Sequence, residues 1–367
     1  MKRIISLIIA LSLSLAVLVS CSGKNNSDAD KNGVSGGNQK PDGSEEKVDY
    51  TKTIDIYLIA GQSNAAGSTL INDDMSLYKD VRETLDGGFT HVHYSGRSYG
   101  VPTDKSNWTK TTSGQGITNR HIGPELGLAK YLSKYYNGET GRHAGIIKFA
   151  HGGSNLLNYT AGSGNQYGNW LPPSYAEELG LSYKDSEITG GLYRKFLKQF
   201  KTSIEGIESY SGHTKINIVG LYWMQGESDR GNPNLYARVF KMFVKDLKKD
   251  LSNITLEFTN GESDCGVSDM AILVGAISQT FSISNANTAF QVNVPFINMQ
   301  KDLVRFIPNC YFVDNSQFAI TKWNQSTGKV EVVGSDSAHW NQNDMIQIGK
   351  NVGKTFVEHI KNKGKGK

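Results

Sequence analysis

Short apolar runs that end abruptly in glycine or polar residues recur along the chain from Thr53 onward. The runs at residues 54–60, 144–150 and 215–223 have little polarity on either face, as expected of parallel strands that are covered on both faces. Weaker strand patterns follow at three further places, residues 254–258, 310–313 and 329–333. The last of these could add only a small edge strand. The pattern therefore predicts a sheet with buried central strands.

Between these runs, apolar residues recur at intervals of three and four, which is the spacing of an amphipathic helix. This pattern predicts helices over residues 123–138, 192–207, 235–251, 298–307 and 341–360. Strands that alternate with helices favour a mainly parallel sheet with helices on both faces. We therefore expect an α/β fold, with a single domain built on a mainly parallel five-stranded sheet. Ligands in such folds bind at the carboxyl ends of the strands.

The amino-terminal segment carries a different pattern. Lys2 and Arg3 precede an apolar run at residues 4–19, and Cys21 follows where cleavage of a signal peptide would fall. The run is short for a comfortable membrane span. Residues 1–21 resemble a bacterial lipoprotein signal whose lipobox ends at Cys21, which implies a lipid on Cys21 and an exported, membrane-anchored protein at the cell envelope or surface. The alternative is an ordinary secretory signal with an incidental cysteine.

Residues 22–52 are rich in Gly, Ser, Asn, Asp and Lys and contain almost nothing apolar. This composition predicts a disordered, solvated tether. The folded domain is then expected over residues 53–360, and the basic residues 361–367 are expected to form a frayed, solvated tail. An anchor, a tether and one folded domain suit a protein that works near a surface.

The charge and the cysteines add few constraints. The 367 residues hold 39 Lys and Arg against 35 Asp and Glu, a net charge of +4 with both signs mixed, so we expect no nucleic-acid partner. Cys265 and Cys310 could pair in an exported protein or stay free, because two cysteines without a spacing motif do not decide the matter. The chain has no CxxC or HExxH motif, so a zinc site has no support in the sequence.

Three predicted strands end in unusual polar sequence, at residues 61–64 (GQSN), 151–155 (HGGSN) and 224–229 (MQGESD). A serine between a buried strand and a helix can present its hydroxyl at the edge of the sheet, although serine is also a common N-cap. A dense polar cluster after an apolar strand is costly unless its groups are hydrogen-bonded or used. These strand ends are therefore candidates for one site.

Asp336 and His339 form a fourth candidate, just before the last predicted helix. An aspartate three residues before a histidine can hold its carboxylate against the imidazole and fix the tautomer that a general base needs. The alternative for this common spacing is an ordinary surface pair. With Ser63, the chain carries Ser, Asp and His in that order.

These blocks resemble a known family in their order along the chain. GQSNAAG, GPELGLA, HGGS, WMQGESD and DSAH are similar to conserved blocks of the SGNH-type carbohydrate esterases, in the branch of the sialate O-acetylesterases and acetyl-xylan esterases, over residues 53–360. The resemblance implies a single SGNH-hydrolase-like, flavodoxin-like domain. It also implies Ser63 as the nucleophile, His339 as the general base and Asp336 as the partner that orients His339.

The resemblance further implies how the reaction is supported. The oxyanion hole would consist of the backbone N–H groups of Ser63 and Gly153 and the side-chain amide of Gln225. Asn64 and Glu227 would fix these loops by hydrogen bonding. No metal or cofactor is needed for this chemistry.

The expected activity is the removal of O-acetyl groups from sugars through an acyl-enzyme, on an acetyl-xylan or a sialate O-acetyl ester. The expected partners are an acetylated carbohydrate and, through the lipid anchor, a membrane. The alternatives are a peptidoglycan or lipid ester hydrolase of the same fold, and a non-catalytic glycan-binding surface lipoprotein. Ala65 and Trp340 depart from the family pattern, and we expect both to alter the wall of the pocket rather than the catalytic groups.

Overall fold

The computed structural model describes residues 52–74, 76–85, 87–98, 107–138, 141–157, 167–184, 188–254, 256–258, 261–263, 267–281 and 293–364. The chain divides into two compact units, Met1–Lys47 and Val48–Lys367, and all described residues belong to the second unit. The predicted signal peptide with Cys21 and the predicted tether, apart from Lys52, lie outside the described residues. Cys265 lies outside them as well.

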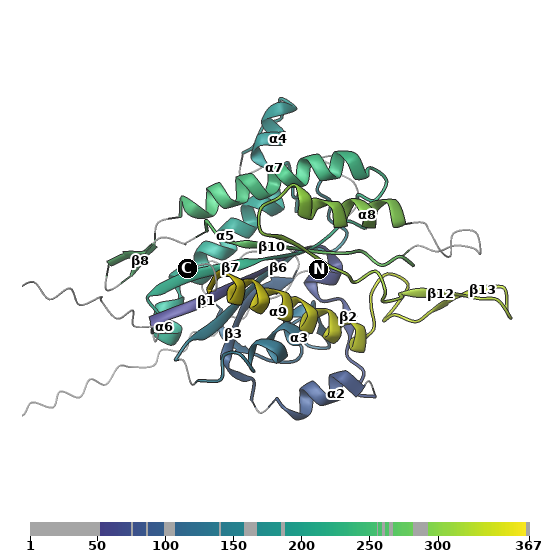
Figure 1. The fold of residues 1–367 in the computed structure, drawn as a ribbon, viewed down its shortest axis with the longest axis horizontal. Coiled ribbons are helices and arrows are strands. Elements are labelled where there is room, and N and C mark those ends of the chain that lie inside the picture. Colours follow the sequence, from purple (N-terminus) through teal and green to yellow (C-terminus); the bar gives the residue numbers. More distant parts are fainter. Residues whose placement is uncertain are drawn as a thin grey trace, which may run out of the picture. The chain divides into compact units, whose positions relative to one another are not determined.

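Among the described residues, seven strands form the main sheet (Figure 1). They are β1 (Thr53–Gly61), β3 (Phe89–Ser98), β4 (Thr109–Thr111), β6 (His143–Ala150), β7 (Lys215–Met224), β10 (Ala271–Gly275) and β11 (Cys310–Val313). Their order across the sheet is β11-β10-β7-β1-β6-β3-β4. Every neighbouring pair is parallel except β3 and β4. The predicted α/β fold with a mainly parallel sheet is therefore confirmed.

The expected number of five strands is wrong, because β3, β4 and β10 do not stand out in the hydrophobic pattern. β3 contains two buried polar residues, His93 and Ser95. They are tolerated because His93 Nε2 lies 2.8 Å from His143 Nδ1 and Ser95 Oγ lies 2.7 Å from Ser203 Oγ. β4 has three residues and β10 has five, too few to show a clear period.

Two predicted strands belong to small separate sheets. β8 (Leu256–Phe258) pairs with β9 (Gly261–Ser263), and β13 (Lys329–Val332) pairs with β12 (Thr321–Asn324). A third small sheet joins β2 (Thr69–Leu70) to β5 (His121–Ile122). None of these pairs extends the main sheet.

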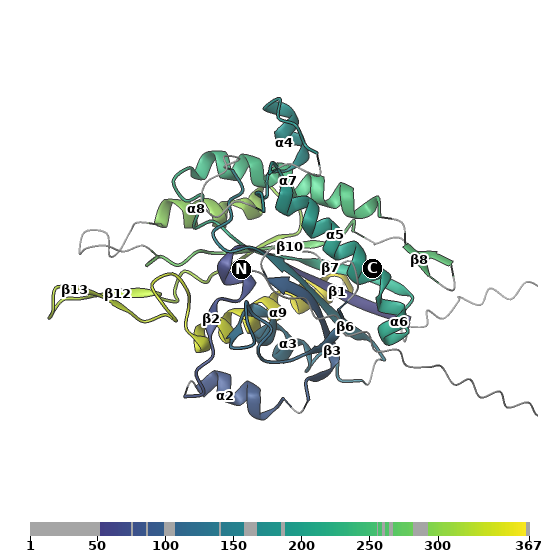
Figure 2. The same cartoon turned by 180° about the vertical axis from the view of Figure 1, so that it is seen from behind.

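Helices cover both faces of the main sheet, as the views from front and back agree (Figures 1 and 2). One face carries α5 (Gly191–Glu205), α7 (Pro233–Ser252) and α8 (Val294–Asp302), and the other carries α2 (Ser76–Glu83), α3 (Pro124–Leu132) and α9 (Gln342–Gly364). The shorter elements are α1 (Ser63–Ala66), α4 (Pro173–Glu178), α6 (Ile207–Ser211) and the 3-10 turn Leu303–Arg305.

Alternation along β1 explains the two layers. Ile56 and Leu58 belong to the apolar core that includes α5, α7 and α8, whereas Tyr57 and Ile59 belong to the core that includes α3 and α9. Successive side chains of a strand point to opposite faces, so an uninterrupted apolar strand supplies both cores.

The helices agree with the pattern in type and differ at their ends. The helix predicted over residues 235–251 is α7, and its apolar stripe is buried. α3 ends at Leu132, earlier than expected, and α9 continues to Gly364, through part of the predicted basic tail. Among the helices of the described residues, none combines the length and the apolar character that crossing a membrane requires.

Four histidines, His91, His93, His143 and His213, gather near the amino ends of β3, β6 and β7. His91 Nδ1 lies 3.2 Å from His143 Nε2, and His93 Nε2 lies 2.8 Å from His143 Nδ1. The ring of His213 lies 4.8 Å from the ring of His143, between centroids. Burial, followed by the neighbouring imidazoles, lowers the pKa of His93 to about 3 and the pKa of His213 to about 4.

We expect this histidine cluster to make the fold labile in acid. An unfolded histidine has a pKa of about 6.5, so His93 and His213 bind protons more strongly in the unfolded chain. The two neutral histidines contribute fully to the free energy of unfolding above pH 6.5. This contribution is lost as the pH falls from 6.5 toward their folded pKa values of about 3 and 4. The loss is roughly 1.4 kcal/mol for each unit by which the pKa is lowered. Urea unfolding of the wild type and a His93→Gln/His213→Gln variant between pH 7.5 and 4 measures this. If the free energy of unfolding falls equally with pH in the two proteins, the prediction is contradicted.

Candidate active site

The three central strands bring the predicted polar blocks to one edge of the sheet. Gly61 at the end of β1 is in register with Ala150 of β6 and with Met224 of β7. The segments that follow these residues therefore start side by side. Gly61 has φ +144°, and a Cβ there would come within 2.1 Å of the Met224 carbonyl oxygen, so only glycine fits this close approach.

Ser63 is the first residue of α1, and it is half-buried. Its backbone N–H has no hydrogen-bond acceptor among the residues that the structure describes. Its carbonyl oxygen accepts hydrogen bonds from the N–H groups of Gly67 (3.0 Å) and Ser68 (3.2 Å), which close the short turn. The turn therefore leaves one backbone donor beside the serine hydroxyl.

Asp336 and His339 are hydrogen-bonded as predicted. His339 Nδ1 lies 2.7 Å from Asp336 Oδ2, and Asp336 Oδ1 accepts the N–H groups of Ala338 (2.7 Å) and His339 (3.0 Å). Partial burial alone would raise the pKa of Asp336, but these hydrogen bonds outweigh it and the pKa lies below its ordinary value. An ionised carboxylate at Nδ1 leaves Nε2 as the nitrogen that can accept a proton.

Hydrogen bonds join the loop of His339 to the segment of Ser63. The amide nitrogen Nδ2 of Asn64 donates to the carbonyl oxygen of Ala338 (3.4 Å) and to Glu227 Oε1 (3.0 Å). Thr69 Oγ1 donates to the carbonyl oxygen of Trp340 (3.0 Å). Ser63, His339 and the loop after β7 are thus held together through the residue that follows the serine.

Gly153 lies in the loop after β6 and is exposed. It has φ +68°, which favours glycine, and a Cβ at this position would meet open space. Its N–H has no acceptor among the described residues, and its carbonyl oxygen accepts the Ser228 hydroxyl at 3.2 Å. The backbone N–H of Gly153 is therefore not used inside the described part of the protein.

Gln225 differs from its expected role. Its side chain is fully buried, and Nε2 donates to Asp229 Oδ2 (2.6 Å), with the Ser154 carbonyl oxygen (3.2 Å) and Gln62 Oε1 (3.3 Å) also in reach. Its Oε1 accepts the Tyr236 hydroxyl at 2.8 Å. Because both amide hydrogens have internal acceptors, Gln225 joins the three loops together instead of presenting a donor to a ligand.

Gln62, to which the sequence pattern gives no role, directly precedes Ser63. Gln62 Oε1 accepts from Gln225 Nε2 (3.3 Å) and from the Ser228 N–H (3.4 Å), and its backbone N–H donates to the Met224 carbonyl oxygen. Its own amide nitrogen has no acceptor among the described residues. Since the oxygen end of the amide is anchored, Gln62 has a donor left over next to Ser63.

Two buried carboxyl groups lie behind these loops. Asp229 Oδ2 accepts the Leu156 N–H at 2.7 Å, and burial raises the pKa of Asp229 although this and other hydrogen bonds oppose the shift. Glu227 is 2% exposed, and burial likewise raises its pKa. Asn64 Nδ2 donates to Glu227 Oε1 at 3.0 Å, so the two side chains predicted to support the loops are in contact.

A buried ion pair lies next to α1. Lys148 Nζ lies 2.8 Å from Glu125 Oε2, and neither side chain is more than 1% exposed. The ammonium also donates to the carbonyl oxygens of Ala66 (3.2 Å) and Gln115 (2.8 Å), and Glu125 Oε1 accepts the Gly123 N–H (2.8 Å). The pair thus ties the last residue of α1 to β6 and to the start of α3.

The expectation for Ala65 and Trp340 is wrong. Both side chains are fully buried in the core that includes α3 and α9, and Trp340 Nε1 donates to the Phe318 carbonyl oxygen at 2.9 Å. They pack in the core beneath the segments of Ser63 and His339 and do not form a pocket wall. Proximity to Ser63 and His339 in sequence was a poor guide, because neighbouring side chains point in different directions.

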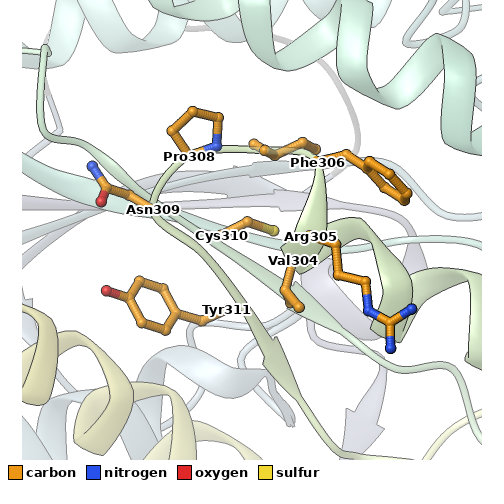
Figure 3. A pocket seen from close by; sticks show the side chains of 8 residues that line it. Val304, Arg305, Phe306, Pro308, Asn309, Cys310 and Tyr311 are labelled. Carbon is orange, nitrogen blue, oxygen red and sulfur yellow. The ribbon is translucent and has the colours of Figure 1, made fainter.

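One hollow lies away from these residues. It has a volume of about 410 Å³ and is lined by residues 304–311, at the amino end of β11 (Figure 3). Cys310 in its wall is a free thiol, and burial raises its pKa to about 12, so it is a poor nucleophile. The polar blocks lie at the carboxyl ends of the parallel strands, so this hollow belongs to the opposite edge. Among the described residues, no group of three or more His, Cys, Asp or Glu side chains could hold a metal ion.

The comparison with known families identifies the class of enzyme. A sequence profile described as "SASA: Carbohydrate esterase, sialic acid-specific acetylesterase" matches residues 53–358. The protein is thus a carbohydrate esterase, a hydrolase of acetyl esters. The chain belongs to the family of sialic acid-specific acetylesterases that this profile describes. The resemblance found from the sequence blocks is confirmed at this level.

Solved structures with some likeness share little sequence with the chain. A protein of Arabidopsis thaliana is 15% identical with a TM-score of 0.48, and the match covers 83% of this chain and 98% of that one. NanS is 12% identical (TM-score 0.49; 85% and 98% covered), and a carbohydrate acetylesterase from Xanthomonas citri is 14% identical (TM-score 0.48; 82% and 55% covered). No curated protein sequence matches the chain significantly. The assignment to the family therefore rests on the sequence match.

Proposed function

We propose that the protein is an SGNH-type serine esterase that removes O-acetyl groups from sugars, with Ser63, His339 and Asp336 as the catalytic residues. The observation that carries this proposal is the Asp336–His339 pair, which is hydrogen-bonded at 2.7 Å and tied through Asn64 to the segment that carries Ser63. An ordinary surface pair would need neither the hydrogen bond from Asn64 to the Ala338 carbonyl oxygen nor the two backbone N–H groups that donate to Asp336 Oδ1.

The reaction follows the order of a serine esterase. His339 Nε2 accepts the proton of the Ser63 hydroxyl while Oγ attacks the carbonyl carbon of the acetyl group. The tetrahedral intermediate collapses, the C–O bond to the sugar breaks, and the imidazolium returns its proton to the sugar oxygen. Water, deprotonated by the same histidine, then attacks the acetyl-serine and releases acetate. Asp336 stays ionised and stabilises the imidazolium in both halves.

The negative charge on the intermediate needs fixed donors. The N–H groups of Ser63 and Gly153 serve this purpose, since neither has an internal acceptor among the described residues. The amide nitrogen of Gln62 supplies a third donor in place of Gln225, whose amide hydrogens are engaged inside the protein. Gln225 then acts by keeping Gln62 and the loop of Ser154 in place.

The substrate is an acetylated carbohydrate, either a sialate O-acetyl ester or an acetyl-xylan, and the family description supports the first. The mature protein is exported and held at the membrane by a lipid on Cys21, with residues 22–52 as the tether. The mass of the mature amino-terminal peptide checks this modification.

Acetate release from a panel of substrates tests the proposed function. We expect release from O-acetyl sialic acid or from acetylated xylan, with acetylated peptidoglycan and a short-chain lipid ester at least tenfold slower in kcat/KM, about 1.4 kcal/mol of discrimination. A reversed order would assign the enzyme to peptidoglycan or lipid esters. Binding of the glycans without any release would favour the non-catalytic alternative.

A further inference from the structure

The side-chain oxygen Oδ1 of Asn64 is a buried acceptor that lacks a donor among the described residues, and the orientation of its amide can be assigned. Its Nδ2 has two acceptors, Glu227 Oε1 and the Ala338 carbonyl oxygen, which use both of its hydrogens. Turning the amide over would set its oxygen against these two oxygens, so the orientation is fixed. In this orientation Asn64 Oδ1 is buried and has no donor among the described residues. A buried acceptor without a donor costs about 1–3 kcal/mol.

Glu227 also has a buried side-chain oxygen without a hydrogen-bond partner among the described residues. Its Oε1 accepts from Asn64, but Oε2 is buried and has no partner among the described residues. The titratable and charged groups around it are His339, Arg230, Tyr222 and Tyr236. Arg230 donates a hydrogen bond to the backbone carbonyl oxygen of Glu227 and not to its carboxylate. A buried, ionised carboxylate with one bare oxygen is strongly disfavoured.

We propose that Glu227 is a protonated carboxylic acid whose Oε2–H donates to Asn64 Oδ1. One proton then supplies the missing donor to Asn64 and the missing partner to Glu227, and the two side chains form a reciprocal pair of hydrogen bonds. Burial of the carboxyl group, opposed by its hydrogen bonds and by His339 and Arg230, raises its pKa in the same direction.

This inference rests on the proposed function of Ser63 and His339 and gives Glu227 a defined part in it as a positioning residue. The Asn64–Glu227 pair fixes the amide that holds the Ala338 carbonyl oxygen, and Ala338 directly precedes His339. A neutral Glu227 also leaves Asp336 as the carboxylate that pairs with the imidazole.

The conservative variant Glu227→Gln distinguishes a protonated from an ionised Glu227. Its amide places an N–H donor where the acid has O–H and keeps the acceptor for Asn64. We expect Glu227→Ala to lower kcat about 30-fold with KM changed less than threefold, since two hydrogen bonds that position the base are lost. Glu227→Gln is expected to recover kcat to within about threefold of wild type and to retain the acid limb of the pH–kcat profile. Asn64→Ala added to Glu227→Ala should cost little more, because the two residues act as a unit.

Infrared spectroscopy gives a readout that does not depend on activity. At pH 7 the wild type should show a protonated-carboxyl C=O stretch that is sensitive to deuteration and absent from Glu227→Gln. Three results would each overturn the proposal. They are a kcat of Glu227→Gln as low as that of Glu227→Ala, a shift of the acid limb of the pH–kcat profile in Glu227→Gln, and absence of the protonated-carboxyl band from the wild type. If Ser63→Ala hydrolyses substrate as well as wild type does, the proposed function fails instead, and the infrared band still decides the state of Glu227.

Discussion

Replacing Ser63 by alanine is expected to reduce acetate release on the order of 10⁴-fold or more, with substrate binding retained. The substitution removes the oxygen that would form the proposed acetyl-enzyme, while the backbone N–H groups of residue 63 and Gly153, the proposed oxyanion donors, are kept. His339→Ala should cost about as much, because the hydroxyl is a poor nucleophile without its base. Initial rates of acetate release, with thermal unfolding as the check on folding, measure both.

The pair Asp336→Asn and Ser337→Ala provides the matched control in the same loop. The asparagine keeps the shape but cannot hold the imidazole in the required tautomer, so kcat should fall about 10²–10⁴-fold. Ser337 is exposed and lies one residue away, and its substitution should change kcat less than twofold. Wild-type rates in both Ser63→Ala and His339→Ala would remove these residues from the mechanism.

Lys148→Met is expected to lower the free energy of unfolding by about 3–5 kcal/mol. The substitution removes the ammonium from a pair that is at most 1% exposed and leaves Glu125 buried without its cation. The carbonyl oxygens of Ala66 and Gln115 lose their donor at the same time. The midpoint of thermal unfolding should fall by roughly 5–10 °C, as scanning calorimetry would show.

The double variant Lys148→Met/Glu125→Gln tests the cause. It removes both charges, and the glutamine oxygen can still accept the Gly123 N–H. Most of the lost stability should return, because replacing both members of a buried ion pair is often nearly neutral. A double variant as unstable as the single one would show that the stability came from the bonds of Lys148 to the backbone rather than from charge pairing.

The sequence indicated the parts of this fold that follow from burial alone. β1, β6 and β7 are apolar on both faces, and α7 has an unbroken stripe, so each could be recognised from its own residues. β3 escaped notice because its buried His93 and Ser95 are satisfied by residues far along the chain. Tertiary hydrogen bonds of this kind leave no trace in a local pattern.

The same distinction applies to the site. The Asp336–His339 contact was predictable because only two residues of one loop separate the partners. The engagement of Gln225 depends on Asp229, Ser154 and Gln62, which come from three loops. Only the register of the strands at Gly61 brings these loops together, and that register is a property of the sheet.

The close pairing of β1 with β6 and β7 also sets the dimensions of the site. Neighbouring strands lie about 4.8 Å apart, so the segments that follow β1 and β6 and carry Ser63 and Gly153 begin about that far apart. Two N–H groups at roughly that separation can straddle one carbonyl oxygen. In the proposed function, the sheet thus fixes where the two donor segments begin, and the hydrogen bonds between the loops complete their placement.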